Sequence, residues 1–395
     1  MTAPDVLAPA ALGPIRLRNR VIKSATFEGA TPDGLVTDAL VDYHRRPAAG
    51  GVGMTTVAYL AVSPEGRTER RQIHWRPEAV PGLRRLTDAV HAEGAAVAAQ
   101  IGHAGPVADA RSNRAPALSC SPMLNPVSMR RTRAATAEDI ERVTAAHARA
   151  ARLAVESGFD SVEIHLGHNY FASAFLSPRL NKRTDAYGGS LANRAKVALG
   201  LARAVRAEVG DRIAVTAKLN MEDGYPGGLR IDDGLQVARW LQEDGTLDAL
   251  ELTAGSSLMN PMYLFTGDVP LREFAANFPL PQRLGIRWFG KKFLRAYPYQ
   301  DTYLMERALR FRAELDMPLI LLGGVTTRAT MDRAMDAGFQ YVAMARALLR
   351  EPDLVNRIGA DPGTPSLCIH CNRCMPTIYT GTRCPELDGR PVVRA

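Results

Sequence analysis

The 395-residue sequence predicts an α/β fold, a (β/α)8 TIM barrel with a long insertion after strand six and a cysteine-rich C-terminal tail. Three observations support this prediction: eight short apolar runs, helix-period segments between them, and one connection far longer than the rest. Alternating strands and helices form a parallel sheet, and eight repeats favour its closure into a barrel. An open, doubly wound sheet is the alternative that fits eight repeats less well.

The eight apolar runs are the predicted barrel strands. Each is short and rich in small or branched apolar residues, as expected of a buried parallel strand. In chain order they are Val21–Ala25, Val52–Val57, Ala95–Ile101, Ser161–His165, Ile213–Leu219, Ala249–Leu252, Leu319–Leu322 and Tyr341–Met344.

Segments with helical periodicity lie between these runs. Ser190 is placed to cap one of the predicted helices, and Gly158, Gly210 and Gly338 each follow a helix as a C-terminal cap would. The predicted helices are Pro77–Glu93, Ala137–Ser157, Ser190–Val209, Asp232–Glu243, Thr302–Leu315 and Thr327–Ala337.

The connection between Leu252 and Leu319 is too long for an ordinary strand-to-helix loop. It is rich in aromatic residues, and its segment 283–295 is also basic. A helix lying on a membrane surface would fit this composition, but Gly285 and Gly290 weaken that interpretation. We expect residues at about 255–300 to form a lid or wall of the active site, because loops at this end of a barrel cover the substrate.

Composition excludes several function classes. The chain is 46% hydrophobic and 23% charged, with no apolar run long enough to span a bilayer and no signal peptide, so we expect a cytoplasmic protein. The net charge of +8 is dispersed, and no basic tract with interleaved aromatic residues indicates nucleic-acid binding. Residues 1–360 are expected to form the barrel and residues 361–395 the tail, and a homo-oligomer is compatible with the sequence.

His165, His168 and Tyr170 follow the fourth predicted strand directly. Their spacing does not suit a metal site on a helix, and no carboxylate follows at a ligand position. Two imidazoles can donate hydrogen bonds to one substrate oxygen, while the phenol delivers a proton. Because chemistry in such barrels lies at the carboxyl ends of the strands, we interpret these rings as catalytic rather than as core residues.

Two further strand ends predict a phosphate site. Gly323 and Gly324 end the seventh strand, and Ala345 and Arg346 end the eighth. Backbone amides at a helix start, with an arginine opposite, bind phosphate in many barrels.

The sequence resembles the Old Yellow Enzyme family of flavin-dependent ene-reductases. The resemblance extends from about Leu12 to Ile358 and depends on ordered motifs. These are Asn19–Thr26, Gln100–Gly105, His165-x-x-His168-x-Tyr170, Phe175–Pro178, Asn181–Arg194, Gly323-Gly324 and Arg346.

The resemblance implies noncovalently bound FMN, NAD(P)H as electron donor and a small-molecule substrate with an activated C=C bond. It assigns His165 and His168 to the substrate oxygen and Tyr170 to protonation of the neighbouring carbon. It also implies a set of cofactor-binding residues: Ala25, Thr26, Ala58, Gln100, His165, Lys218, Gly323, Gly324, Ala345 and Arg346.

The sequence departs from the family pattern at several positions. Lys218 stands where an arginine usually lies near the flavin, and we expect it to supply positive charge there rather than to be an interior lysine paired with an acid. Glu28 occupies a position often held by an aromatic residue, which suggests a more polar or basic ligand. Ala345 replaces a glycine of the phosphate site, and Asn169 replaces a small residue beside Tyr170.

Four cysteines gather in the tail, at Cys368, Cys371, Cys374 and Cys384. Clustered thiols in a large cytoplasmic protein indicate a metal rather than a disulfide scaffold. The segment resembles the cluster-binding segment of 2,4-dienoyl-CoA reductase and trimethylamine dehydrogenase relatives, which implies a [4Fe–4S] cluster held by four thiolates. Structural zinc is the second alternative and free thiols the third.

The resulting prediction is an FMN-dependent NAD(P)H oxidoreductase that reduces the activated C=C bond of α,β-unsaturated carbonyl or related compounds. One alternative is an amine or dehydrogenation enzyme that passes electrons from FMN through an iron–sulfur cluster to a partner. The other is an inactive barrel with a zinc-stabilised interaction tail, against which the intact His165, His168 and Tyr170 set argues.

Overall fold

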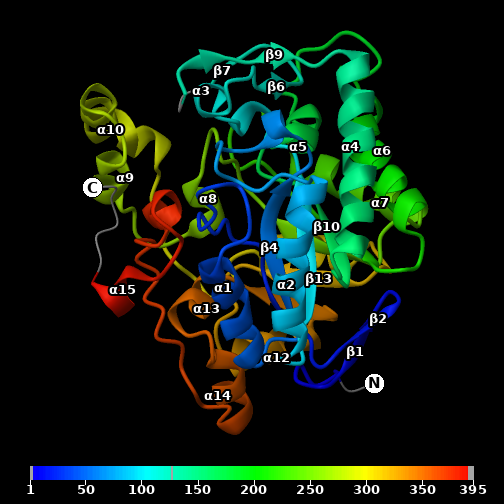
Figure 1. The fold of residues 1–395 in the computed structure, drawn as a ribbon, viewed down its shortest axis with the longest axis vertical. Helices are drawn as coiled ribbons and strands as arrows, with labels where there is room; N and C mark the ends of the chain where they lie inside the picture. Colours follow the sequence, from blue (N-terminus) through cyan, green and yellow to red (C-terminus); the bar gives the residue numbers. More distant parts are fainter. Residues whose placement is uncertain (1–2, 126–127, 390–395) are drawn as a thin grey trace.

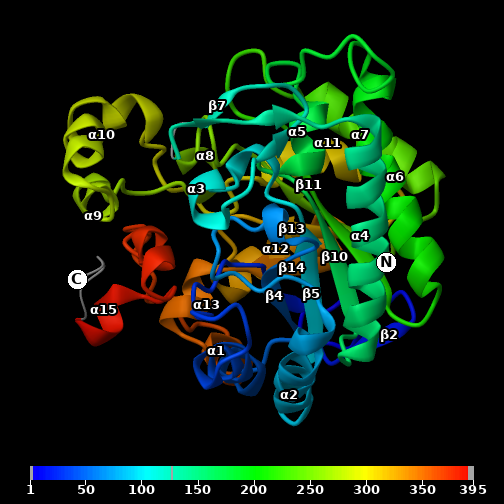
Figure 2. The same cartoon turned by 45° about the horizontal axis from the view of Figure 1, so that its top comes forward.

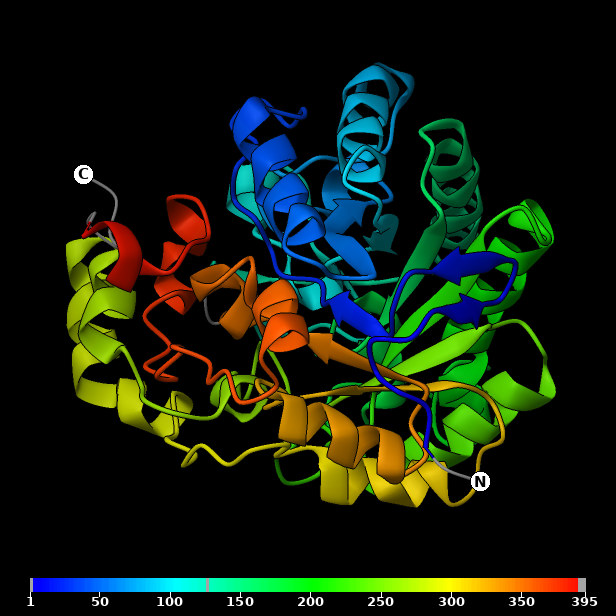
Figure 3. The ribbon, with the colours of Figure 1, turned by 90° about the horizontal axis from the view of Figure 1, so that it is seen from below.

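Eight parallel strands close into a barrel in the computed structural model, which describes residues 3–125 and 128–389. Their order around the barrel is β10-β11-β12-β13-β14-β3-β4-β5, so every predicted run is a strand and the predicted closure is confirmed (Figures 1 and 3). The strands are β3 (Val21–Lys23), β4 (Met54–Ala61), β5 (Ala96–Gly102), β10 (Ser161–Leu166), β11 (Ala214–Asn220), β12 (Ala249–Thr253), β13 (Leu319–Leu322) and β14 (Tyr341–Met344).

Helices surround the barrel, and each of the six predicted segments contains one. The sequence analysis did not predict α1, α13 or α14, and in α1 Pro47 interrupts the helical pattern. Ser190 Oγ accepts from the Asn193 N–H at 3.3 Å, as a cap should. The helices are α1 (Asp38–Ala49), α2 (Val80–His91), α4 (Ala137–Glu156), α6 (Leu191–Val209), α7 (Ile231–Glu243), α11 (Met305–Arg312), α12 (Arg328–Asp336), α13 (Arg346–Arg350) and α14 (Leu354–Ala360).

The barrel interior is apolar at one end and polar at the other. The N-terminal hairpin of β1 (Ala10–Leu12) and β2 (Ile15–Leu17) packs with strand residues such as Met54 and Tyr341 and closes the apolar end. At the other end the strand register places His165 beside Lys218, and Lys218 beside Glu251. Alternate residues of each strand point into the barrel, and at this end they include the charged side chains of Lys218 and Glu251.

The predicted insertion after the sixth strand is present between β12 and β13. It contains α8 (Met262–Phe265), α9 (Leu271–Ala276) and α10 (Leu280–Phe293). All three ribbon views show α9 and α10 beside the C-terminal tail, which holds a 3-10 helix (Met375–Tyr379) and α15 (Pro385–Asp388) (Figures 1 to 3). The contact is apolar: Met262, Leu294 and Met375 form one buried cluster.

Short elements extend the barrel at the carboxyl ends of β5 and β10 (Figure 2). They are α3 (Ala110–Asn113), β6 (Leu118–Ser119), β7 (Leu124–Asn125), β8 (Arg130–Arg131), β9 (Arg133–Ala134) and α5 (Phe171–Leu176). No helix in the described part of the chain is both long and apolar enough to cross a membrane.

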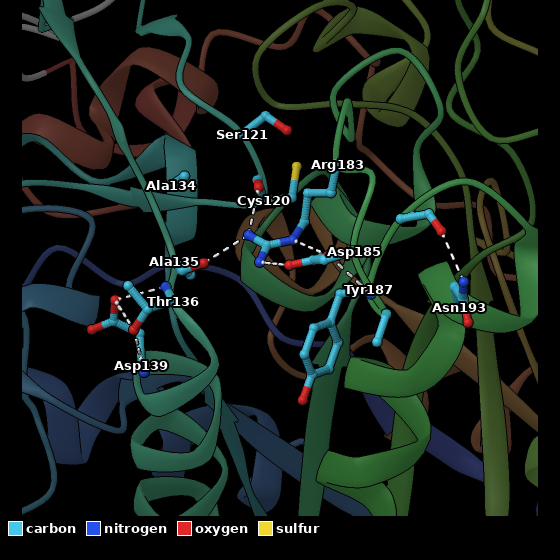
Figure 4. A network of polar contacts seen from close by, with 12 residues as sticks. Cys120, Ser121, Ala134, Ala135, Thr136, Asp139, Arg183, Asp185, Tyr187 and Asn193 are labelled. Atoms are coloured by element: carbon cyan, nitrogen blue, oxygen red, sulfur yellow. Dashed lines mark hydrogen bonds and ion pairs between the residues drawn. The ribbon is translucent and has the colours of Figure 1, made fainter.

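Arg183 connects the loop after α5 to these short elements through hydrogen bonds (Figure 4). Its guanidinium donates to the carbonyls of Cys120 at 3.1 Å and Ala135 at 2.6 Å, and it pairs with Asp185. Asp185 in turn accepts from the Tyr187 N–H at 3.1 Å. This part of the motif Asn181–Arg194 therefore fixes the loop between β10 and α6.

Candidate active site

The three predicted catalytic rings lie together at the end of β10. The Tyr170 ring stacks on the His165 ring, with centroids 4.3 Å apart and 19° between the planes. The His168 ring meets His165 edge-on, with centroids 5.2 Å apart. The three residues, which are close in sequence, therefore also lie together in space.

His165 is a neutral imidazole whose free nitrogen can donate. Burial lowers its pKa well below the ordinary value, and the nearby His168 and Lys218 act in the same direction. Its Nδ1 accepts from the Gly167 N–H at 3.2 Å, which leaves the ring proton on Nε2. The geometry thus assigns Nε2–H as a hydrogen-bond donor.

His168 is held by two neighbouring strands. Its Nε2 lies 2.9 Å from Thr253 Oγ1, and its N–H donates to Asn220 Oδ1 at 3.0 Å. Burial, with a smaller effect of Lys218, lowers its pKa to about 3, so the ring is neutral. If the Thr253 hydroxyl donates to Nε2, the Nδ1 of His168 keeps the proton and becomes a second donor.

Tyr170 is a buried phenol with a raised pKa. Burial is the main cause, and hydrogen bonds with the Thr68 and Ser257 side chains oppose it. The hydroxyl keeps its proton at neutral pH and can still protonate a strongly basic carbon.

Lys218 is an interior lysine paired with two acids, the arrangement that the sequence analysis disfavoured. Its Nζ lies 2.9 Å from Glu251 Oε1 and 3.2 Å from Glu163 Oε1. Burial disfavours the charge of Lys218, but the two carboxylates outweigh burial and raise its pKa. The sequence did not reveal these partners because Glu163 and Glu251 come from the two flanking strands, far from Lys218 in sequence. A positive charge of Lys218 beside the flavin stays a prediction.

Gln100 joins the same network, because its Nε2 donates to Glu163 Oε1 at 2.6 Å. Glu251 Oε2 is buried and has no hydrogen-bond partner in the described part of the chain. The polar end of the barrel therefore keeps an acceptor for an N–H of a bound ring. This donor and acceptor set fits the pyrimidine edge of a flavin.

Glu28 has partners within the protein. Its Oε1 accepts from the Ala58 N–H at 2.7 Å and lies 3.0 Å from His44 Nε2. These partners explain the Glu28 carboxyl group without a basic ligand. Ala58, which was expected to bind the cofactor, donates its N–H to this carboxyl group. Ala25 and Ala58 pack in one cluster with Tyr170.

Thr26 lies beside this cluster and is partly buried. Its Oγ1 donates to the Ser24 carbonyl at 3.1 Å, so its hydroxyl has a local partner.

The predicted phosphate-binding residues line one cavity of about 340 Å³. Gly323 and Gly324 have φ of 100° and 78°, conformations that favour glycine, and a Cβ on Gly324 would lie 2.6 Å from the Thr302 backbone nitrogen. Ala345 and Arg346 face them from the end of β14. This glycine-lined cavity, with an arginine in its wall, fits a phosphate group.

Arg346 lies between this cavity and the tail. Its Nη1 donates to the Thr266 carbonyl at 2.8 Å and also contacts the amide oxygen of Asn372, which follows Cys371. It lines the phosphate cavity and a second cavity of about 460 Å³. The four tail cysteines, Cys368, Cys371, Cys374 and Cys384, all line this second cavity.

The four tail cysteines gather around one cavity. Within residues 3–125 and 128–389, no three His, Cys, Asp or Glu side chains gather closely enough to hold a single metal ion. All four tail thiols line the same cavity, as the predicted metal site in the tail requires.

Several site residues were not anticipated from the sequence. Glu163, Glu251, Thr253 and Asn220 are polar residues at alternating positions of barrel strands, and that period-two pattern could have revealed them. Tyr299, Tyr303 and His370 line the phosphate cavity. They come from the insertion and the tail, and no sequence signal placed them there.

Comparison with known proteins gives a consistent result. A sequence model of the NADH:flavin oxidoreductase / NADH oxidase family matches residues 5–255. The 4,4'-dithiodibutanoate disulfide reductase of Rhodococcus erythropolis is 52% identical over 356 residues, which cover 90% of this chain and 88% of the relative. The multifunctional alkene reductase/demethylase OYE of Caballeronia cordobensis is 29% identical over 84% of this chain and 45% of its own.

Solved structures with similar folds include the Old Yellow Enzyme homologue of Zymomonas mobilis. It has a TM-score of 0.75 at 21% identity, with 97% of this chain and 98% of that chain covered. A 2-naphthoyl-CoA reductase has a TM-score of 0.80 at 24% identity, and this chain spans 55% of its length. These likenesses support the barrel fold.

Proposed function

The chain belongs to the NADH:flavin oxidoreductase / NADH oxidase family, and from this premise we propose that it is an FMN-dependent reductase of activated C=C bonds. The observation that carries the proposal is the stacked pair His165 and Tyr170 with His168 beside it. When bound, FMN accepts two electrons from NAD(P)H and delivers them to the substrate as hydride. Gln100, Lys218, Gly323, Gly324 and Arg346 are the residues that would hold it.

His165 and His168 bind the substrate's carbonyl oxygen through neutral N–H donors. As the β-carbon gains hydride, negative charge builds on that oxygen, and preorganised donors stabilise it. Both rings are uncharged because burial lowers their pKa, so each donates a hydrogen bond and does not give up its proton. Tyr170 then gives its proton to the carbon next to the carbonyl group, and solvent restores the phenol.

Reduction of an organic disulfide is a second candidate, favoured by the relative that is 52% identical. The overall reaction is R–S–S–R + NAD(P)H + H⁺ → 2 R–SH + NAD(P)⁺. One sulfur receives hydride as the S–S bond breaks, and Tyr170 protonates the thiolate that leaves. Tyr170 can act in both candidate reactions, because each requires one proton at the atom next to the one that receives hydride.

Anaerobic half-reactions test both candidates. The oxidised protein is reduced with NADH or NADPH while flavin absorbance at about 450 nm is followed, and then mixed with enones or disulfides. We expect reduction by at least one nicotinamide and reoxidation by one of the two substrate classes. A flavin that stays reduced with every member of both classes would contradict the proposal.

We also propose that the tail holds a [4Fe–4S] cluster. The support is that four cysteines line one cavity, and that the tail resembles the cluster-binding segment of 2,4-dienoyl-CoA reductase and trimethylamine dehydrogenase relatives. Cys368, Cys371, Cys374 and Cys384 are the proposed ligands.

Metal content tests the tail proposal. Anaerobically purified protein should hold about four irons per chain. Cys371→Ser should remove the broad visible absorption of the cluster and retain FMN, whereas Cys120→Ser, which changes a buried cysteine outside the tail, should retain both. One zinc and no iron per chain would select the structural alternative, and neither metal would overturn the site.

A further inference from the structure

The cysteine-rich tail contributes one side chain to the phosphate cavity. His370 lies between the first two tail cysteines in the sequence, and it lines this cavity together with Gly323, Gly324 and Arg346. His370 also lines the cavity of the four tail cysteines, as Arg346 does. The His370 side chain therefore lies where the predicted cofactor site and the predicted metal site meet.

The His370 ring is held by Tyr299, which comes from the end of the insertion. The two rings stack with centroids 3.3 Å apart and 8° between their planes. The Tyr299 hydroxyl donates to Asp301 Oδ1 at 2.9 Å and lies 3.4 Å from the Gly324 carbonyl oxygen. Because Gly324 also lines the phosphate cavity, this stack holds the imidazole beside the glycine-lined wall.

The backbone around His370 is anchored to the first part of the insertion. The Asp268 N–H donates to the His370 carbonyl at 3.1 Å. Gly267 approaches the same carbonyl so closely that a Cβ on it would lie 2.2 Å from the oxygen. The side-chain amide of Asn372 donates to the carbonyls of Thr266 at 3.1 Å and Asp268 at 2.9 Å. These contacts fix the position of the segment that carries the ring.

The His370 ring retains a nitrogen that can bind a ligand. Its Nδ1 has only a long contact, at 3.8 Å, with Cys368 Sγ. Its Nε2 has no hydrogen bond with any residue in the described part of the chain. A neutral imidazole can donate one N–H, and the residues that line the phosphate cavity include no Asp or Glu that would repel an anion. The ring therefore suits a phosphate oxygen.

We propose that His370 is a phosphate-binding residue and that the tail is thereby part of the cofactor site. The ligand class is a flavin with a terminal phosphate. Arg346 supplies the positive charge, and the His370 imidazole adds a directed N–H donor. The inference deepens the proposed function and rests on its flavin cofactor. It gives the tail a role in cofactor binding that is separate from the role of its thiols.

FMN and riboflavin, which lacks the phosphate, are the matched ligands for the test. The full-length protein is stripped of flavin and titrated with each ligand, while quenching of the flavin fluorescence is followed. We expect His370→Ala to raise the Kd for FMN about tenfold, as loss of a hydrogen bond to a charged group does, and to leave the Kd for riboflavin unchanged. His370→Gln keeps an N–H donor and should recover part of the FMN affinity.

Ile369→Ala is the control within the tail. Ile369 is exposed, precedes His370 and lines the cysteine cavity but not the phosphate cavity. This variant should bind both flavins with the wild-type Kd.

Two results of the titration would overturn the inference. An equal rise of both Kd values in His370→Ala would assign the ring a structural role, and an unchanged Kd for FMN would exclude it from the phosphate. If the wild type binds neither flavin, the flavin cofactor of the proposed function fails, and the inference fails with it.

The phosphorus NMR spectrum of the FMN-saturated protein gives a second readout, which does not depend on affinity or turnover. His370→Ala should shift the resonance of the bound phosphate, because a hydrogen bond to one of its oxygens is lost. Ile369→Ala should keep the wild-type resonance. A resonance in His370→Ala that coincides with that of the wild type would contradict the inference.

Discussion

Tyr170→Phe is expected to slow reoxidation of the reduced protein by an enone by about 10²–10⁴-fold, the usual contribution of a positioned acid. The reason is that the phenol acts only after hydride has reached the substrate. Reduction of the flavin by NAD(P)H should proceed at nearly the wild-type rate, because no proton from Tyr170 enters that step. Stopped-flow absorbance of the two half-reactions, measured separately, checks the prediction.

Tyr59→Phe is the matched control for this variant. The Tyr59 ring meets the Tyr170 ring edge-on, with centroids 5.4 Å apart, and its hydroxyl donates to the Gly66 carbonyl at 3.0 Å. Its loss should therefore affect reoxidation far less. If Tyr170→Phe slows both half-reactions equally, the residue has a packing role and the assignment as proton donor is wrong.

Replacing both His165 and His168 with Ala should have the second large effect. Each ring supplies one preorganised donor, and loss of one such donor typically costs about 10²–10³-fold in rate. Reoxidation by an enone should fall accordingly, and phenols that mimic an enolate oxygen should bind more weakly. A titration that follows the long-wavelength absorbance of the phenol–flavin complex measures the binding.

The Asn variants of the same residues separate hydrogen bonding from packing. His165→Asn and His168→Asn each keep an N–H donor near the original position, so each should retain more phenol affinity than the corresponding Ala variant. An unchanged phenol titration in the double Ala variant would exclude both histidines from the oxygen site.

Much of the barrel could be predicted from the sequence because its strands are short apolar runs and its helices have strong periodicity. The segment that forms α1 was missed because Pro47 lies inside it. The ring set after β10 was predictable because His165, His168 and Tyr170 are close in sequence. The partners of Lys218 were not, because Glu163 and Glu251 reach it only when neighbouring strands align in register.

The insertion between β12 and β13 shows a second limit of prediction from the sequence. Its aromatic residues suggested a lid or wall, yet Phe278 packs against Tyr379 of the tail, with centroids 5.9 Å apart. Near the two ends of the helical part, Met259 and Arg295 line one surface cavity. Contacts between an insertion and a distant tail leave no periodic signal in either segment, so the sequence could not reveal them. The role of residues 255–300 as a lid or wall of the active site stays a prediction.

The central claim is that hydride reaches the carbon β to the carbonyl group while Tyr170 protonates the neighbouring carbon. A single turnover in D₂O tests it most directly, with the protein reduced by NAD(P)H and 2-methylcyclohex-2-enone as the substrate. We predict deuterium at the α-carbon of the product, with this product formed much more slowly by Tyr170→Phe. Protium at the α-carbon, or a product that forms equally fast in that variant, would contradict the claim.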